Sequence, residues 1–90
     1  MLLSRMMSGV LQRPVWSGTP IKGSDIWTLR KAKGDTAHMA VCELWTHLFG
    51  WKLRLLVDDD LQRSRVCRSY NEWLDAADEW KAAMLKKGWT

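Results

Sequence analysis

Residues 51–68 read Trp51-Lys52-Leu53-Arg54-Leu55-Leu56-Val57-Asp58-Asp59-Asp60-Leu61-Gln62-Arg63-Ser64-Arg65-Val66-Cys67-Arg68. Apolar residues occupy every second position from Trp51 to Val57, which is the period of a strand with one buried face. The aspartate cluster that follows is typical of a turn, and a second strand-like run comes after it. The stretch therefore predicts a tight β-hairpin, and this hairpin sets the fold class of the chain.

A second hairpin is predicted ahead of the first, with its turn at Gly34 and Asp35. Residues 26–31 alternate in polarity and form its first strand. The Gly-Asp pair is a two-residue loop signal, because glycine accepts the positive φ of a type II′ turn. The returning strand is expected over residues 36–45, and a loop over residues 46–50 connects the two hairpins.

The last segment of the chain carries a helical pattern. Ser69-Tyr70-Asn71-Glu72 has the spacing of a capping box, in which the serine and glutamate side chains bond free amides of the first turn. One apolar stripe at helical spacing comprises Trp73, Ala76, Ala77, Trp80, Ala83 and Met84. Gly88 is placed to end the helix. The sequence thus predicts an α+β fold (ββββα), a four-stranded antiparallel meander sheet with one C-terminal helix packed on one face.

Length and charge set the domain organisation. The chain has 90 residues, which allows one small domain, and its formal net charge is +4. Arg5, Arg13 and Lys22 give residues 1–24 a charge of +3 without any carboxylate, so residues 25–90 carry only +1. The leading segment also shows no sustained period. We therefore predict a disordered tail at residues 1–24 and a single α+β domain at residues 25–90.

Several interpretations of residues 1–24 stay open. A secretory signal needs an unbroken apolar run of about 7–15 residues, which Arg5 interrupts. An organelle transit peptide agrees better with a basic, acid-free composition. We favour an untied tail or a start codon placed too far upstream. No stretch approaches the roughly 20 apolar residues of a membrane span, and we expect a cytoplasmic protein.

The two turns also predict strand register. The pairs that follow from them are Leu29 with Ala40, Trp27 with Cys42, Leu53 with Ser64 and Trp51 with Val66. Side chains that lie directly opposite share a face, so the predicted helix-facing set is Trp27, Leu29, Ala40, Cys42, Leu44, Trp51, Leu53, Leu55, Val57, Ser64 and Val66. Glu43 then points away from the helix. The core is expected to contain four or five tryptophans.

The opposite, open face of the predicted sheet divides into two halves. With a four-residue loop at 47–50, a candidate partner-contact apolar cluster comprises Val41, Leu56 and Leu61. Beside it, a candidate binding patch comprises Trp45, Lys52, Arg54, Arg63 and Arg65. Glu43 is expected to pair with Arg54. The open face therefore combines a basic, aromatic half with an apolar half.

Three uses agree with the composition of this face. It agrees with an ordinary solvated surface, with a partner surface such as a homodimer interface, and with a single-stranded nucleic-acid platform on which bases stack on Trp45. Four strands followed by a helix resemble the Whirly type of single-strand binder at the level of the fold alone. We predict a non-catalytic protein-interaction module whose partner is another protein or a second copy. Single-stranded nucleic-acid binding is the alternative.

Catalytic, metal and cofactor sites are not expected. Cys42 and Cys67 fall on the second and fourth strands and face opposite sides, so we predict reduced thiols in a reducing compartment. His38, Cys42 and His47 lack a fourth ligand for zinc. The aspartate cluster lacks the glycine and distal glutamate of a calcium loop. Because the sequence has no phosphate loop, nucleophile elbow or carboxylate pair, we predict no enzyme activity and no cofactor.

Five motifs in the folded part of the chain carry a resemblance. They are Trp27-Thr28-Leu29, Cys42-Glu43-Leu44-Trp45, Gly50-Trp51-Lys52-Leu53-Arg54, Arg63-Ser64-Arg65-Val66-Cys67-Arg68 and Lys87-Gly88-Trp89. Over residues 27–89 the chain resembles a group of small bacterial proteins of unknown function. In that group the turn at 58–60 looks more like Asp-Gly, whereas this chain has Asp59. The resemblance implies a bacterial source and one ordered domain, with no activity or ligand attached.

Overall fold

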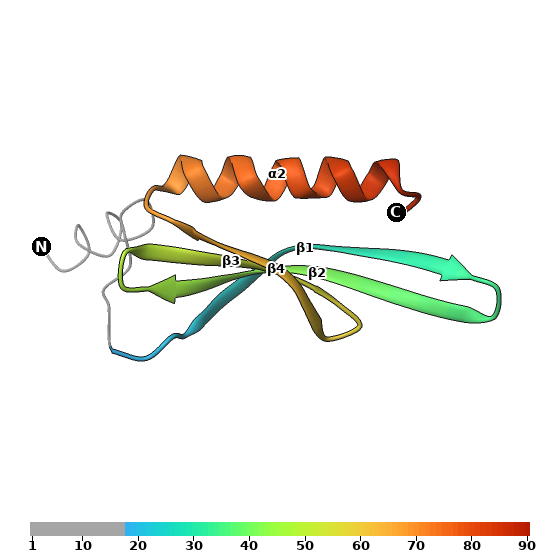
Figure 1. Cartoon of the computed structure of the whole chain (residues 1–90), viewed down its shortest axis with the longest axis horizontal. Helices are drawn as coiled ribbons and strands as arrows, with labels where there is room; N and C mark the ends of the chain where they lie inside the picture. The colour runs from blue at the N-terminus through green and yellow to red at the C-terminus, as the bar shows by residue number, and fades with distance from the viewer. Residues whose placement is uncertain (1–17) are drawn as a thin grey trace, which may run out of the picture.

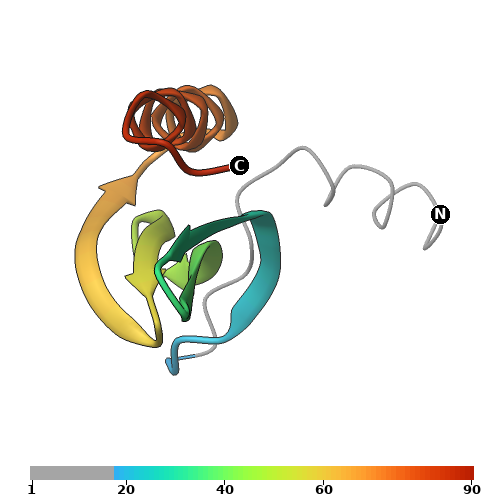
Figure 2. The same cartoon turned by 90° about the vertical axis from the view of Figure 1, so that its right-hand side faces the viewer.

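The structure is a computed structural model that describes residues 18–90. Its elements are β1 Lys22–Lys33, β2 Thr36–His47, β3 Gly50–Val57, β4 Asp60–Cys67 and α2 Tyr70–Lys86. The sheet order is β1-β2-β3-β4, and every neighbouring pair is antiparallel. The helix runs along one face of the sheet (Figure 1), and the strands curl beneath it when viewed along the long axis (Figure 2). The predicted α+β meander with one C-terminal helix is confirmed.

The first hairpin extends further than its pattern predicted. Its register places Trp27 opposite Cys42 and Leu29 opposite Ala40, as expected. β1 starts at Lys22, ahead of Asp25, and two register shifts mark its first residues. Just before it, the Ile21 carbonyl accepts a backbone hydrogen bond from Thr46 at 2.9 Å. The remainder of the predicted tail, residues 1–17, lies outside the described residues.

The connection between β2 and β3 is tighter than predicted. Strand pairing continues to His47 opposite Gly50, so only Leu48 and Phe49 form the turn where a loop over 46–50 was expected. The register between β2 and β3 is the predicted one. Trp45 lies opposite Lys52, and the pairing continues without a shift to Ala40 opposite Val57. The positions of the open-face side chains on β2 and β3 are therefore as expected.

The second hairpin departs from its predicted register after two residue pairs. Val57 lies opposite Asp60 as predicted, and Leu56 lies opposite Leu61. A bulge then leaves Gln62 without a partner, so every later β4 residue shifts by one position and changes face. The predicted pairing of Leu53 with Ser64 and of Trp51 with Val66 is wrong. The observed partners are Leu55 with Arg63, Leu53 with Arg65 and Trp51 with Cys67.

Contacts with the helix explain why the bulge forms. It turns Cys67 into the core, where the side chain is fully buried. It also brings the Arg63 guanidinium to 4.6 Å from the Trp80 ring, and it places Arg65 3.6 Å from the Glu72 carboxylate. A regular ladder would forgo all three contacts. The predicted inward positions of Ser64 and Val66 are therefore corrected to the open face.

Two aspartates close the β3–β4 turn in the left-handed backbone region. Asp58 has φ 51° and Asp59 has φ 68°, which is the pattern of a type I′ turn. Asp58 also fastens the turn to β2, because its Oδ2 lies 2.6 Å from Nδ1 of His38 and its Oδ1 accepts from the Met39 amide at 3.0 Å. At the β1–β2 turn, which Gly34 and Asp35 form, only Gly34 has a positive φ. Its value of 62° is what a type II′ turn requires.

The helix begins and ends where its signals predicted. Ser69 is the N-cap, and its Oγ accepts from the Glu72 amide at 3.1 Å. The Glu72 carboxylate reaches back to the Arg68 amide, one residue before the predicted target. Gly88 has φ 95°, and the Trp89 amide donates to the Met84 carbonyl at 3.2 Å, which closes the last turn.

The core lies between the helix and the sheet and is rich in tryptophan. Five of the six tryptophans within residues 18–90 belong to it, in agreement with the prediction. The buried hydrophobic residues are Trp27, Leu29, Ala40, Cys42, Leu44, Trp51, Leu53, Leu55, Cys67, Trp73, Ala76, Ala77, Trp80, Met84 and Trp89. Trp27 ties the two layers together, because its Nε1 donates to the Ala77 carbonyl at 2.9 Å.

Replacing Asp59 with glycine should stabilise the domain. The residue has a left-handed backbone, which costs an L-residue roughly 1–2 kcal/mol and costs glycine nothing. We expect Asp59→Gly to raise the thermal midpoint by about 4–8 °C, the shift that about 1 kcal/mol produces in a domain of this size. Asp35→Gly is the matched control, since Asp35 is not left-handed and glycine there adds only unfolded-state freedom. An equal rise in both variants would contradict this explanation.

Asp58 should contribute to stability in a pH-dependent way. The hydrogen bond from His38, followed by that from the Met39 amide, lowers the pKa of Asp58 below its ordinary 3.8. A lowered carboxyl pKa stabilises the fold above the ordinary value, and this effect is lost as pH falls through the lowered pKa. Asp58→Asn keeps an acceptor oxygen without the charge. In urea unfolding we expect it to be less stable than the parent at about pH 6, and the difference should shrink as pH falls below the ordinary pKa of 3.8. A constant difference would refute the linkage.

Candidate binding site

Three of the five residues in the predicted binding patch meet on the open face. Trp45 on β2 lies opposite Lys52 on β3, and Arg54 follows two residues later on the same side of β3. The Arg54 guanidinium carbon lies 5.1 Å from the centre of the Trp45 ring, which is cation–π geometry. These three side chains come from adjacent central strands, so the sheet holds them in a fixed arrangement.

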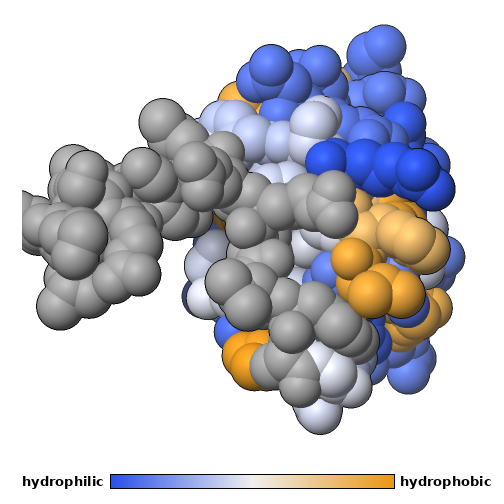
Figure 3. Space-filling view, turned by 90° about the vertical axis from the view of Figure 1, so that its left-hand side faces the viewer, coloured by the Kyte–Doolittle hydropathy of each residue, from blue (hydrophilic) through white to orange (hydrophobic). Residues whose placement is uncertain are grey.

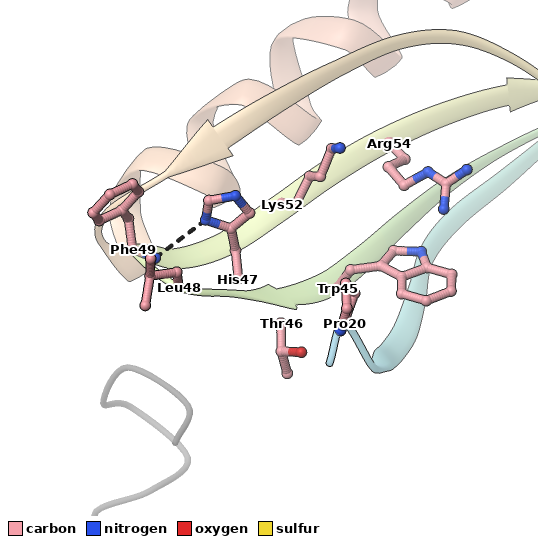
Figure 4. A pocket seen from close by; sticks show the side chains of 8 residues that line it. All are labelled: Pro20, Trp45, Thr46, His47, Leu48, Phe49, Lys52 and Arg54. Carbon is pink, nitrogen blue, oxygen red and sulfur yellow. Dashed lines mark hydrogen bonds between the residues drawn. The ribbon is translucent and has the colours of Figure 1, made fainter. Parts of the chain in front are cut away.

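A cavity of about 520 Å³ opens beside this group. Its walls come from β2, β3, the turn between them and the segment ahead of β1 (Figure 4). The lining residues are Pro20, Trp45, Thr46, His47, Leu48, Phe49, Lys52 and Arg54. Two aromatic rings and two cations therefore share one cavity, and none of the lining residues is acidic.

Hydrogen bonds and ion pairs fix the Trp45 side of the site. The indole Nε1 donates to the Glu43 carboxylate at 2.9 Å, and the same carboxylate lies 3.2 Å from the Lys22 ammonium. Glu43 thus forms its ion pair with Lys22. The predicted partner of Glu43 was Arg54. The Arg54 Nε–H is buried and has no acceptor within residues 18–90. This nitrogen is shielded from solvent, although the Arg54 side chain lines the cavity.

The β2–β3 turn supplies apolar residues that the sequence interpretation missed. Leu48 is 52% exposed and Phe49 is 46% exposed. The Arg68 guanidinium covers the Phe49 ring at 5.0 Å, and the Phe49 amide donates to Nδ1 of His47 at 3.1 Å. Figure 3 faces this end of the molecule and shows apolar side chains beside strongly hydrophilic ones. The only available signal was two adjacent large apolar residues inside a predicted loop.

Arg63 and Arg65 do not belong to this site. Their placement on the open face beside Trp45 was predicted, but the Gln62 bulge turns both toward the helix side. Arg63 stacks on Trp80 and Arg65 approaches Glu72. The basic patch around Trp45 therefore keeps two of its four predicted cations, Lys52 and Arg54.

The apolar cluster on the open face is confirmed in its arrangement. Val41 lies opposite Leu56, and Leu56 lies opposite Leu61, so the three form one row across β2, β3 and β4. Leu61 is exposed and so is Met39, one row further along β2. The next row along the open face contains Glu43 and Arg54, and Arg54 lines the cavity.

The two thiols lie in the core. The prediction that Cys42 and Cys67 face opposite sides is wrong, because the bulge turns Cys67 inward, and both side chains are free and fully buried. Burial, with nearby Glu43 and Cys67 adding to it, raises the pKa of Cys42 to about 12. Burial also raises the pKa of Cys67. Both groups therefore remain protonated at neutral pH.

The next features to consider within the described residues are metal ligands and membrane-spanning helices. Between residues 18 and 90, no group of three or more His, Cys, Asp or Glu is arranged to hold a metal ion. Of the three residues that sequence proximity suggested for zinc and that lack a fourth ligand, His38 bonds Asp58, Cys42 lies in the core and His47 accepts from the turn. In the same range no helix is long and apolar enough to cross a membrane.

Comparison with known proteins adds no assignment. No family model, curated protein or solved structure matches this chain. The resemblance to small bacterial proteins stays a prediction.

Both cysteines should be unreactive in the folded protein. A thiol reagent attacks the thiolate, and burial disfavours that form at Cys42 and Cys67. With an excess of an aromatic disulfide reagent at about pH 8, we expect no release of chromophore over minutes in native buffer and reaction of both thiols in guanidinium. Rapid modification of either cysteine in native buffer would contradict their placement in the core.

Proposed function

We propose that this chain is a non-catalytic protein-interaction module, and that the cavity at Trp45 receives an apolar side chain flanked by carboxylates of a partner protein. The observation that carries the proposal is the composition of the cavity wall, which combines Trp45 and Phe49 with Lys52 and Arg54 and contains no acid. A volume of about 520 Å³ falls in the range of ligand sites and accommodates one or two side chains.

Exposed apolar area supports a protein partner. Leu48 and Phe49 project beside the cavity mouth, and contiguous apolar surface at a rim of polar residues is characteristic of interaction sites. Aromatic residues and arginine are also the types that contribute most to binding at protein interfaces. A partner that covers the turn would bury both side chains.

Charge supports an acidic partner. Lys52 and Arg54 line the cavity, and Arg68 lies over Phe49 at its edge. A partner carboxylate in the cavity would form charge-assisted contacts with Lys52 and Arg54. The segment of this chain ahead of Pro20 carries Arg5 and Arg13 and no acid, so its charge is unsuitable for this role.

Single-stranded nucleic acid is the less favoured occupant. It would use Trp45 for base stacking and cations for phosphates, but Arg63 and Arg65 lie on the other face of the sheet. Arg54 already covers one face of the Trp45 ring. The remaining open-face cations are too few to follow a backbone over several nucleotides.

We also propose a bacterial, cytoplasmic setting. It is supported by the two cysteines, which remain free thiols as expected in a reducing compartment. The bacterial source rests on the resemblance over residues 27–89.

The test is a titration with a defined probe, a fluorescein-labelled hexapeptide of alternating aspartate and phenylalanine, followed by fluorescence anisotropy. We expect Phe49→Ser and Lys52→Glu each to weaken binding about tenfold, as for central interface residues. Leu85→Ser and Lys81→Glu are matched controls, because both alter exposed residues of α2 away from the cavity. A lysine-phenylalanine peptide should bind poorly.

Two further measurements separate the other occupants. A labelled oligothymidylate titrated at two salt concentrations reports nucleic-acid binding, and light scattering reports self-association. The nucleic-acid alternative would replace our proposal if the chain does not bind the peptide but binds the oligonucleotide in a salt-sensitive way that Lys52→Glu abolishes. A dimer that Phe49→Ser dissociates would make a second copy the occupant. Peptide binding unaffected by either cavity variant would reject the site.

A further inference from the structure

The two edges of the sheet are in different states. β1 forms one edge, and the end of the chain closes it, since Thr90 donates to the Arg30 carbonyl at 2.9 Å and accepts from the Arg30 amide at 2.7 Å. The Lys31 ammonium adds a hydrogen bond to the Lys87 carbonyl at 2.6 Å. This edge is therefore paired with main chain at its centre.

β4 forms the other edge, and none of residues 18–90 covers it in this way. Within residues 18–90, the β4 backbone forms hydrogen bonds with the backbone of β3 and with that of no other segment. Every β4 residue except Cys67 is exposed. The bulge at Gln62 interrupts the strand near its turn, and regular pairing resumes from Arg63. An edge strand with unpaired amides and carbonyls is a template for strand addition.

The side chains on this edge indicate which strand would fit. Arg63 and Arg65 lie on the same side of the sheet, because they oppose Leu55 and Leu53. Both arginines are solvent-exposed. Arg65 lies 3.6 Å from the Glu72 carboxylate, and about a third of the Glu72 side chain is itself exposed to solvent. A surface pair of this kind contributes little, so Arg65 is able to exchange Glu72 for another carboxylate.

A second copy of this chain is disfavoured on the same edge. Antiparallel pairing of β4 with itself about Ser64 places Arg63 opposite Arg65 of the other copy, twice over. Shifting the register by two positions sets Arg63 or Arg65 opposite its own counterpart. Like charges directly opposite each other destabilise a strand pair. The arginines therefore act against self-pairing and favour an acidic strand.

We propose that the β4 edge binds an extended segment of a partner protein by strand addition, with acidic residues at alternate positions facing Arg63 and Arg65. The side chains between them would lie on the open face, next to Ser64 and Val66, where small or apolar residues fit. This surface is separate from the cavity at Trp45, so the inference stands or fails independently of the proposed function.

The probe is a labelled, end-blocked nonapeptide of alternating glutamate and valine. We expect Arg63→Glu and Arg65→Glu each to weaken its binding about tenfold by anisotropy, since attraction is replaced by repulsion. Arg30→Glu is the matched control, an exposed arginine on the closed edge. Phe49→Ser should leave binding unchanged, which separates this site from the cavity.

Backbone chemistry distinguishes strand addition from general charge attraction. Methylating the peptide nitrogens of one alternating set removes the donors that face β4, whereas methylating the other set leaves them intact. We expect one of the two methylated peptides to lose binding at least tenfold and the other to retain it. Equal binding of both would overturn the inference, as would binding unaffected by Arg63→Glu and Arg65→Glu.

A charge-swapped double variant guards against misfolding as the cause of lost binding. The chain with both Arg63→Glu and Arg65→Glu should lose the glutamate-valine peptide and gain a lysine-valine peptide. Failure of the parent chain to bind the acidic peptide at millimolar concentration would also overturn the inference. So would a dimer in light scattering whose β4 amides are protected from hydrogen exchange.

Discussion

Burial of helix tryptophans against sheet tryptophans is the interaction on which the rest of this structure depends. Trp73 and Trp80 extend from α2 into the core that Trp27 and Trp51 build from the sheet. Each such side chain removes roughly 200 Å² from water, or about 5 kcal/mol as an upper estimate. A domain of this size buries only about 60% of its unfolded surface, so a few large side chains must supply most of the driving force. One of them also sets the helix position, because the Trp27 indole bonds the Ala77 carbonyl.

The same helix decides the register of the strand that precedes it. A regular β3–β4 ladder would keep one more paired residue, yet the chain leaves Gln62 unpaired. Contacts with α2 compensate for the lost pairing, because Cys67 is buried in the core and Arg63 lies over Trp80. The edge strand, with one hydrogen-bonded neighbour, is the strand that yields most easily to such contacts.

This explains which parts of the molecule could be predicted from sequence. Turns and caps depend on neighbouring residues, so Gly34 and Ser69 mark their elements correctly. The parity of β2 and β3 follows from keeping Glu43 out of the core, which places Trp45, Lys52 and Arg54 correctly. The bulge could not be predicted, because it depends on helix contacts up to seventeen residues further along the chain. The turn residues at the cavity carry no periodicity that a pattern could reveal.

The one-residue shift at Gln62 also changes the class of partner that the surface suits. A regular hairpin would have kept Arg63 and Arg65 beside Trp45, and four cations around an aromatic ring resemble a single-strand platform. The bulge moves these two arginines to the other side of the sheet at its free edge. What stays at Trp45 is an apolar, aromatic cavity with two cations, a composition suited to a protein side chain. A backbone irregularity selected by core packing thus places the proposed binding cavity and the proposed strand-binding edge on different parts of the sheet.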